Sequence, residues 1–257
     1  LALLGVGALH LVDHEDLSLS NRNRYVGARH DDPIPGSRKV ELGKRLIQSI
    51  DPEIAVEIVP DGLLCRAGFN AVRTADVVFG CVDHDGVRFV LNELCLAYRK
   101  VLIDLASDAP EPGCYGGRVT VVTGNNGCLS CRDLLDQKEV RQLLSPASVI
   151  ENERAAYGIT HDALDEAGPS VVFLNGVIAS LGVGEFSALI TGTRTPYSHL
   201  EYRGHEGIVR RRKDEPMPDC YYCGATSGQG DAAGLDRYLK SEASDAATPG
   251  HRASTTV

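Results

Sequence analysis

The sequence predicts an α/β protein built around a doubly wound, mostly parallel sheet. Short apolar segments that end in a carboxylate alternate with segments of helical periodicity through the first half of the chain. This alternation is typical of parallel strands joined by helices that cover both faces of a sheet. Two C-x-x-C pairs further on indicate a C-terminal part held by a zinc ion. With 257 residues, 43% of them hydrophobic, the chain can bury the core of one large domain.

The first strand is the apolar run 8–12, and a turn rich in serine and asparagine follows it. Residues 38–50 carry apolar side chains at helical spacing, and Asp51-Pro52 ends that helix. The alternating run 54–59 is the next strand. Two further buried strands and the helix between them complete a β-α-β-α-β rhythm: 76–83, 86–98 and 101–105.

Beyond this core the pattern becomes less regular. We expect a strand at 118–122, helices at 133–144 and 171–191, and a strand pair at 199–203 and 208–212. Residues 145–160 are polar with little periodicity. From Ala225 the chain is rich in Gly, Ala, Ser, Thr and Asp, which predicts a disordered tail over 225–257 with one helical turn near 235–239. Residues 1–224 are therefore expected to form one domain.

Two carboxylates follow strands of the predicted sheet. Asp13 comes directly after the first strand, and Asp83 ends the strand at 76–83. Each has an ordinary interpretation, Asp13 as a turn residue and Asp83 as a helix cap. The carboxyl ends of parallel strands meet at one edge of a sheet, which is where such folds bind ligands. One carboxylate can then hold a ribose and the other Mg²⁺ with its waters.

Candidate phosphate ligands lie between these carboxylates. Arg24 follows the Ser/Asn-rich turn, and Lys39 lies near the start of its helix, where backbone N–H groups add positive potential. Solvated surface charges are the usual fate of such residues. Arg22, Arg38 and Arg88 are alternative ligands that position alone does not rank.

The cysteines form the strongest local motif. Cys128 with Cys131 and Cys220 with Cys223 are two C-x-x-C pairs, and four thiolates in two such pairs match a tetrahedral structural zinc site. A redox C-x-x-C is the alternative, although it needs an exposed thiolate at a helix start. The remaining four cysteines are isolated, and small buried hydrophobic residues are their favoured interpretation: Cys65, Cys81, Cys95 and Cys114.

Charge and composition exclude several function classes. A net charge of -9 argues against a broad nucleic-acid-binding surface. The apolar run 171–190 contains Asn175, Glu185 and several glycines, so a buried or interface helix is favoured over a membrane span. The first residues lack the pattern of a signal peptide. Together with eight cysteines, this predicts a reducing, cytoplasmic location.

Several motifs occur in one order from the first residues to about Gly224. They are Leu11-Val12-Asp13 with Glu15, Ser20-Asn21 with Arg24, Gly36 with Lys39-Val40-Glu41, Asp51-Pro52, Asp76-Val77-Val78 to Asp83, Arg88 with Asn92, Gly116-Gly117-Arg118-Val119, both C-x-x-C pairs, and the late apolar segment from Gly168 to Thr191. In this order they resemble the ThiF/MoeB/HesA family, the bacterial relatives of ubiquitin-activating enzymes.

The resemblance implies an ATP-dependent adenylyltransferase. The family activates the C-terminal glycine carboxylate of a ubiquitin-like or sulfur-carrier protein as an acyl-adenylate and releases pyrophosphate. It implies that Asp13 binds the ATP ribose, that Arg24 and Lys39 bind phosphates, and that Asp83 binds Mg²⁺. Glu15, Ser20 and Asn21 complete the expected nucleotide site, and the four paired cysteines bind zinc. A homodimer is also implied, with the 171–190 helix as a possible interface.

The chain departs from the family pattern in two ways. The glycine-rich loop of this Rossmann-like fold, and the strand before it, are expected upstream of Leu1, because Gly5-Val6-Gly7 precedes a strand rather than following one. No cysteine lies between Cys131 and Cys220, so we expect adenylation without an enzyme thioester, unless Cys114 or a residue outside this chain serves. Two other classes remain open, a nicotinamide-dependent oxidoreductase and a non-catalytic zinc-containing scaffold that binds a ubiquitin-like protein. Neither the acceptor nor the pathway can be inferred from the sequence.

Overall fold

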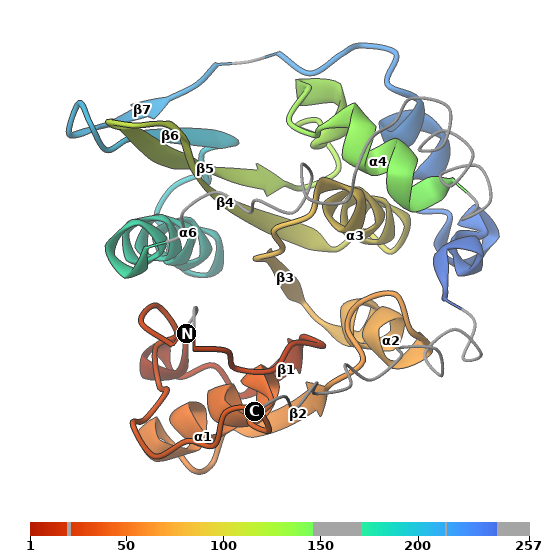
Figure 1. Ribbon diagram of the computed structural model, residues 1–257. Coiled ribbons are helices and arrows are strands. Elements are labelled where there is room, and N and C mark those ends of the chain that lie inside the picture. Colours follow the sequence, from red (N-terminus) through yellow and green to blue (C-terminus); the bar gives the residue numbers. More distant parts are fainter. Residues whose placement is uncertain (20–21, 146–170, 214, 241–257) are drawn as a thin grey trace, which may run out of the picture.

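The computed structural model describes residues 1–19, 22–145, 171–213 and 215–240 (Figure 1). Ser20 and Asn21 lie outside the described residues, as do nearly all of the polar segment expected at 145–160 and the tail beyond Lys240. The described elements form a mixed α/β fold in which helices pack against two sheets.

The strands form two sheets instead of one mostly parallel sheet. β1 (Ala8–Val12) and β2 (Ala55–Val59) make a parallel pair. The second sheet has the order β3-β4-β5-β6-β7, and only β3 and β4 are parallel in it. Its strands are β3 (Val77–Gly80), β4 (Val101–Glu111), β5 (Cys114–Val122), β6 (His199–Arg203) and β7 (Ile208–Arg211).

The expectation of a mostly parallel sheet is therefore wrong, for a physical reason. Two residues connect β4 to β5, and four connect β6 to β7, and connections this short can only join antiparallel strands. Parallel pairing occurs only where a helix lies between the strands. That helix is α1 (Lys39–Ile50) in the first sheet and α3 (Asp85–Ala97) in the second.

Helices cover both faces of the five-stranded sheet, as the sequence predicts. Successive residues of β4 point to opposite faces: Leu102 packs in one buried cluster with Phe89 and Leu94 of α3, while Ile103 packs in another with Ile178 of α6 (Val172–Thr191). Figure 1 shows α3 and α6 on either side of β4. By length and composition α6 could also cross a membrane, and here it packs along β4 and β5.

Among the α-helices of the described residues, one was not predicted. α2 (Arg66–Thr74) is short, and a glycine interrupts its pattern. That glycine is needed because a Cβ on Gly68 would lie 2.5 Å from the carbonyl oxygens of Gly62 and Leu63. The close approach lets α2 begin directly beneath the loop that follows β2, with the Cys65 thiol accepting a hydrogen bond from the Gly68 N–H at 3.3 Å.

The segment 225–240 is folded, contrary to the expectation of disorder there. It contains two 3-10 turns, Gly230–Ala233 and Leu235–Tyr238, of which the second coincides with the predicted helical turn. Leu235 is buried against α3, and Arg66 of α2 forms a two-point ion pair with Asp236 at 2.8 and 2.9 Å. The sequence pattern did not predict these contacts, because most residues of this segment are small or polar.

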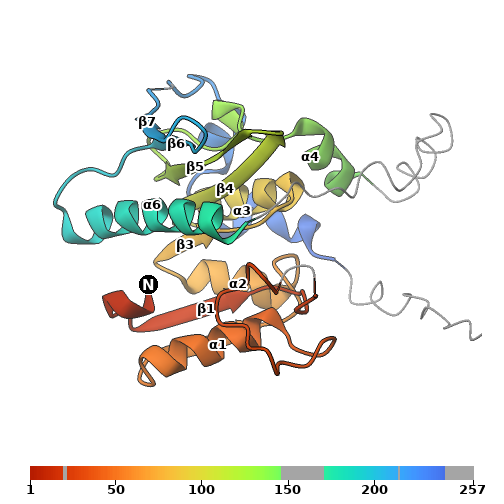
Figure 2. The ribbon, with the colours of Figure 1, turned by 60° about the vertical axis from the view of Figure 1, so that its left-hand side comes forward.

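A large cleft separates the two sheets. It has a volume of about 2820 Å³, and residues of β1 and α1 line one side, while residues of β3, α3 and α6 line the other. Figure 2 shows β1 and α1 as a layer below β3 and α6. Among the described residues, β1 pairs only with β2 and β3 only with β4, so each has an open edge.

Candidate active site

The loop after β1 forms the first wall of the cleft. Asp13 accepts a hydrogen bond from the Glu15 N–H at 2.9 Å, which turns the chain sharply at the strand end. Backbone hydrogen bonds then join this loop to the start of α1, from Lys39 N–H to Glu15 O at 3.0 Å and from Leu17 N–H to Ser37 O at 2.8 Å. The buried side chain of Leu17 anchors the loop. Asp13 and Lys39, which are 26 positions apart in the sequence, are thereby brought to the same side of the cleft.

Lys39 and Asp13 share an environment on this wall. The Lys39 ammonium forms an ion pair with Glu15, and its side chain is only 15% exposed. The Tyr25 hydroxyl donates to the Lys39 carbonyl at 2.5 Å. Burial, together with the negative charge of Asp13, raises the pKa of Tyr25 to about 12. The loop carboxylates and the lysine thus lie close to a half-buried tyrosine, and Arg24 lines the same cleft.

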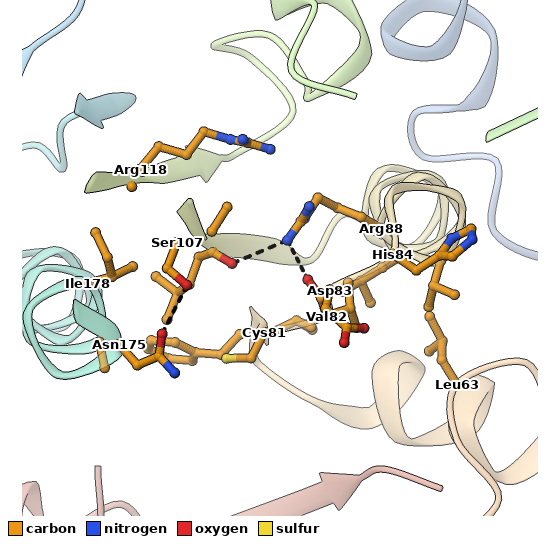
Figure 3. A pocket seen from close by; sticks show the side chains of 18 of the residues that line it. Leu63, Cys81, Val82, Asp83, His84, Arg88, Ser107, Arg118, Asn175 and Ile178 are labelled. Atoms are coloured by element: carbon orange, nitrogen blue, oxygen red, sulfur yellow. Dashed lines mark hydrogen bonds between the residues drawn. The ribbon is translucent and has the colours of Figure 1, made fainter. Parts of the chain in front are cut away.

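Asp83 lies on the opposite wall, where it follows β3 and is exposed to the cleft (Figure 3). Its loop is held from behind by Arg88 of α3, whose guanidinium donates to the carbonyl of Val82 and pairs with Asp85. Arg88 also donates to Asp104 of β4 at 2.9 Å and is itself 5% exposed. One buried arginine therefore connects the loop, α3 and the sheet.

A buried charge cluster continues behind this loop. Asp104 is fully buried, and burial raises its pKa, while Arg88 and Arg118 oppose that shift. Arg118 lies 4.0 Å from Asp104 and donates to the Leu134 carbonyl at 2.8 Å. Burial lowers the pKa of Arg118. Sequence reasoning missed Asp104, although a carboxylate inside the apolar run 101–105 was a usable signal.

The structure brings five of the seven predicted nucleotide-site residues to one cleft: Asp13, Glu15, Arg24, Lys39 and Asp83. The other two, Ser20 and Asn21, are not described. Of the alternative phosphate ligands, Arg88 lines the cleft, but its guanidinium is already engaged by Val82, Asp85 and Asp104. Arg38 is engaged elsewhere, because it donates to the His14 carbonyl at 2.9 Å and pairs with Asp16 at 3.3 Å.

The four paired cysteines converge on one point. The Cys128 and Cys220 sulfurs lie 3.9 Å apart, as do those of Cys131 and Cys223, and all four lie within 4.8 Å of one another. Four sulfurs bound at about 2.3 Å around one zinc ion would lie about 3.8 Å apart. The Cys128 N–H donates to the Cys131 sulfur at 3.0 Å. The cluster therefore has the dimensions of a four-thiolate metal site.

The isolated cysteines differ from one another. Cys95 belongs to α3 and is buried in the core, as expected of a small hydrophobic residue. Cys65 and Cys114 are half-buried, and Cys81 is exposed on the cleft wall, so the expectation of burial is wrong for these three. Position in the sequence could not distinguish them, because Cys81 and Cys95 both lie in largely apolar stretches.

Sequence comparisons relate this chain to known proteins. The model of the ThiF family matches residues 1–222. The protein HesA of Leptolyngbya boryana is 34% identical over 226 residues, which cover 87% of this chain and 71% of HesA. Molybdopterin-synthase adenylyltransferase of Escherichia coli is 36% identical over 229 residues, covering 87% and 80%. The E. coli sulfur carrier protein ThiS adenylyltransferase is 26% identical, covering 88% and 80%.

Solved structures share the fold. The crystal structure of E. coli MccB with ATP superposes with a TM-score of 0.64 at 19% identity, covering 87% of this chain. The chain spans 61% of that MccB chain. The similarity at this identity establishes the mixed α/β architecture.

Proposed function

Because the chain belongs to the ThiF family, we propose that it is an ATP-dependent adenylyltransferase acting on a C-terminal carboxylate. The substrate is a ubiquitin-like or sulfur-carrier protein, or a peptide, that ends in glycine, and the products are an acyl-adenylate and pyrophosphate. One observation carries the proposal: Asp13 and Lys39 on one wall and Asp83 on the other line the same cleft. Two of the relatives are adenylyltransferases by name.

Each predicted nucleotide-site residue has a role in this reaction. Asp13, at the end of a parallel strand, accepts hydrogen bonds from the ribose, and Glu15, Ser20 and Asn21 complete the nucleotide site. Arg24 and Lys39 bind phosphate oxygens. Lys39 exchanges its contact with Glu15 for the phosphate when ATP enters. Asp83 would hold Mg²⁺ through its carboxylate, and the ion would neutralise charge on the phosphates.

The reaction needs charge stabilisation more than proton transfer. The attacking carboxylate is already ionised at neutral pH, so no general base is required. Two anions repel as the carboxylate oxygen bonds to the α-phosphorus and the bond to the pyrophosphate oxygen breaks. Arg24 and Lys39 reduce this repulsion and stabilise the charge that develops on pyrophosphate. Arg88 acts indirectly, because it fixes the loop that presents Asp83.

We also propose that a further parallel strand and the expected glycine-rich loop occupy the cleft between β1 and β3. Both strands have an open edge there, and an exposed edge offers unpaired backbone groups to another strand. Backbone N–H groups of such a loop would bind phosphates. A chain limited to residues 1–257 should therefore bind ATP more weakly than a chain extended upstream. Equal affinity of the two chains in calorimetric titration would contradict this.

The metal site and the assembly complete the proposal. Zn²⁺ is the ion that the four thiolates would hold, because a compact set of four sulfur ligands favours it. A second copy of the chain packs on α6, whose apolar residues Val172, Phe173 and Ile190 are exposed. The eight cysteines are free, which suits a reducing, cytoplasmic location.

ATP–pyrophosphate exchange separates the candidate functions. The proposal predicts exchange that depends on a candidate protein or peptide ending in glycine, and Asp83→Ala abolishes it. An oxidoreductase would instead bind a nicotinamide cofactor and show no exchange, and a scaffold would bind the carrier protein without exchange. Exchange that survives Asp83→Ala would refute the role of this residue.

A further inference from the structure

A second cavity lies away from the cleft, at the opposite end of β3 and β4. It measures about 290 Å³ and shares no lining residue with the cleft. Lys100 directly precedes β4, whose start pairs with the start of β3, whereas Asp83 follows the end of β3. The polar residues that line the cavity are Arg99, Lys100, Thr123, Asn125 and Ser227, and Gly124 lies among them.

Two adjacent cations of this cavity are held in place by the backbone. Arg99 has a φ of 51°, and its N–H donates to the Leu96 carbonyl at 3.2 Å, while the Lys100 N–H donates to the Cys95 carbonyl at 2.8 Å. These bonds end α3 and satisfy its last carbonyls without either side chain. Within the described parts of the chain, neither Arg99 nor Lys100 forms an ion pair with a carboxylate, in a protein whose net charge is -9.

The guanidinium of Arg99 is positioned by a glycine. A Cβ on Gly228 would lie 2.4 Å from its Nε and 2.7 Å from its Nη2, so the side chain rests directly on the Gly228 backbone. That backbone is fixed in turn, because the Gly228 N–H donates to the Leu96 carbonyl at 3.0 Å. Arg99 is therefore preorganised beside the cavity, although it is exposed to solvent.

The other side of the cavity supplies neutral donors. Thr123 and Ser227 carry hydroxyl groups and Asn125 an amide, and all three residues line the space. The Asn126 side chain accepts from the Thr123 N–H at 2.9 Å and fixes the turn, in which Gly124 has a φ of 83°. Hydroxyl and amide donors opposite two cations are the groups that bind a tetrahedral oxyanion.

We propose that this cavity is a binding site for a small phosphate-type oxyanion, distinct from the nucleotide cleft. Arg99 and Lys100 supply the charge, and Thr123, Asn125 and Ser227 supply hydrogen bonds. Ser227 follows the second cysteine pair by four residues, and Arg99 follows α3, so the anion would link the end of α3 to the segment 225–240. The anion is either free or part of a larger molecule such as a nucleotide.

The test uses inorganic phosphate as the probe on the full chain, at constant ionic strength set with chloride. Phosphate should raise the melting temperature in a saturable way. Arg99→Gln and Lys100→Gln should each weaken the apparent affinity by about 10-fold. Lys138→Gln, on an exposed part of α4 (Gln137–Leu144), is the matched control and should leave it unchanged. AMP in place of phosphate distinguishes a free anion from a nucleotide phosphate.

Two outcomes would overturn the site. A rise in melting temperature that is equal for phosphate and chloride would show that the cations are only solvated. A saturable rise that persists in both variants would place the anion elsewhere. Circular dichroism of each variant without phosphate confirms that it is folded. The result does not depend on the proposed adenylation, because its readout is stability and none of these residues lines the cleft.

Discussion

Arg88 shows how a single buried side chain can fix a functional loop. Its guanidinium reaches the Val82 carbonyl, Asp85 and Asp104 at once, and the planar fork of arginine suits three such acceptors better than lysine does. The contrast with Arg66 is informative. Arg66 makes an equally short pair with Asp236, but both side chains are more than half exposed.

Arg88→Ala should therefore be far more destabilising than Arg66→Ala. Removal of Arg88 leaves the charge of Asp104 buried without its closest partner, which costs about 3–5 kcal/mol. Arg66→Ala breaks a solvent-exposed pair and should cost about 1 kcal/mol or less. Urea unfolding of the two variants measures the difference. Similar losses of unfolding free energy in the two variants would show that the side chains around Arg88 are solvated.

Lys39→Gln should weaken ATP binding without loss of stability. The lysine is proposed to bind a phosphate, and a charged hydrogen bond of this kind is worth about 1.5–3 kcal/mol, or at least about 10-fold in affinity. Lys44→Gln, on the same helix but outside the cleft, is the control. Affinity measured by titration calorimetry on the full-length protein should fall for the first variant only. An equal fall for both would indicate a general effect of charge.

At the scale of elements, a second ion pair, besides that of Lys39 with Glu15, joins α1 to the loop before it. Arg45 of α1 donates to both carboxylate oxygens of Asp32, at 2.5 and 2.8 Å, and to the Gly27 carbonyl at 2.9 Å. The Arg45 guanidinium, and then the Arg29 N–H, hold the pKa of Asp32 well below its usual range. This loop connects the candidate phosphate ligands Arg24 and Lys39.

The acid stability of the protein should depend on this pair. A carboxylate with a lowered pKa in the folded state contributes stability above its ordinary pKa of about 4 and loses it as the pH falls below that value. Asp32→Asn should therefore be less stable than the parent at pH 7, and the gap should close as the pH falls below about 4. Asp31→Asn is the control, because Asp31 makes no hydrogen bond with Arg45. Melting curves from pH 7 to pH 3 test this, and a gap independent of pH would contradict it.

The same elements show what could be predicted from the sequence. α1, with Val40, Leu42 and Ile47 buried, and the strands β1 to β4 follow from periodicity. α2 was missed because Gly68, which its packing requires, weakens the helical pattern. The expectation of a mostly parallel sheet was wrong because strand pairing is set by connection lengths and by tertiary contacts, which the apolar pattern of a strand does not show. Asp13, Lys39 and Asp83 could be predicted because they lie at strand and helix ends. Asp104 and Arg118 could not, because only the pairing of β4 with β5 brings them together.

For the whole molecule, the cysteine cluster joins segments that are far apart. Cys128 and Cys220 are 92 positions apart, and both belong to the core that includes α3. The Leu129 N–H donates to the buried amide oxygen of Asn92 at 3.1 Å, and Phe89 packs edge-on against Tyr222 at 5.2 Å. Since α3 also carries Arg88, the cysteine cluster and the cleft both contact this helix.

Removal of the metal should therefore loosen the whole fold. We expect one zinc ion per chain, and Cys220→Ser should lower the melting temperature by about 10 °C, which corresponds to roughly 3 kcal/mol for a chain of this size. Cys114→Ser, which removes a half-buried cysteine outside the cluster, should have little effect. Metal analysis and calorimetry provide the measurement. A metal-free protein with an unchanged melting temperature would contradict a structural role.

The most direct test of the account is ATP–pyrophosphate exchange by the full-length protein. Radiolabelled pyrophosphate should enter ATP only when a carrier protein or peptide with a C-terminal glycine is present. Amidation of that C-terminus should abolish the exchange, because the attacking carboxylate is lost, and Asp83→Ala should abolish it while the protein remains folded. Exchange that continues with the amidated substrate, or no exchange with any substrate that ends in glycine, would contradict adenylation in this cleft.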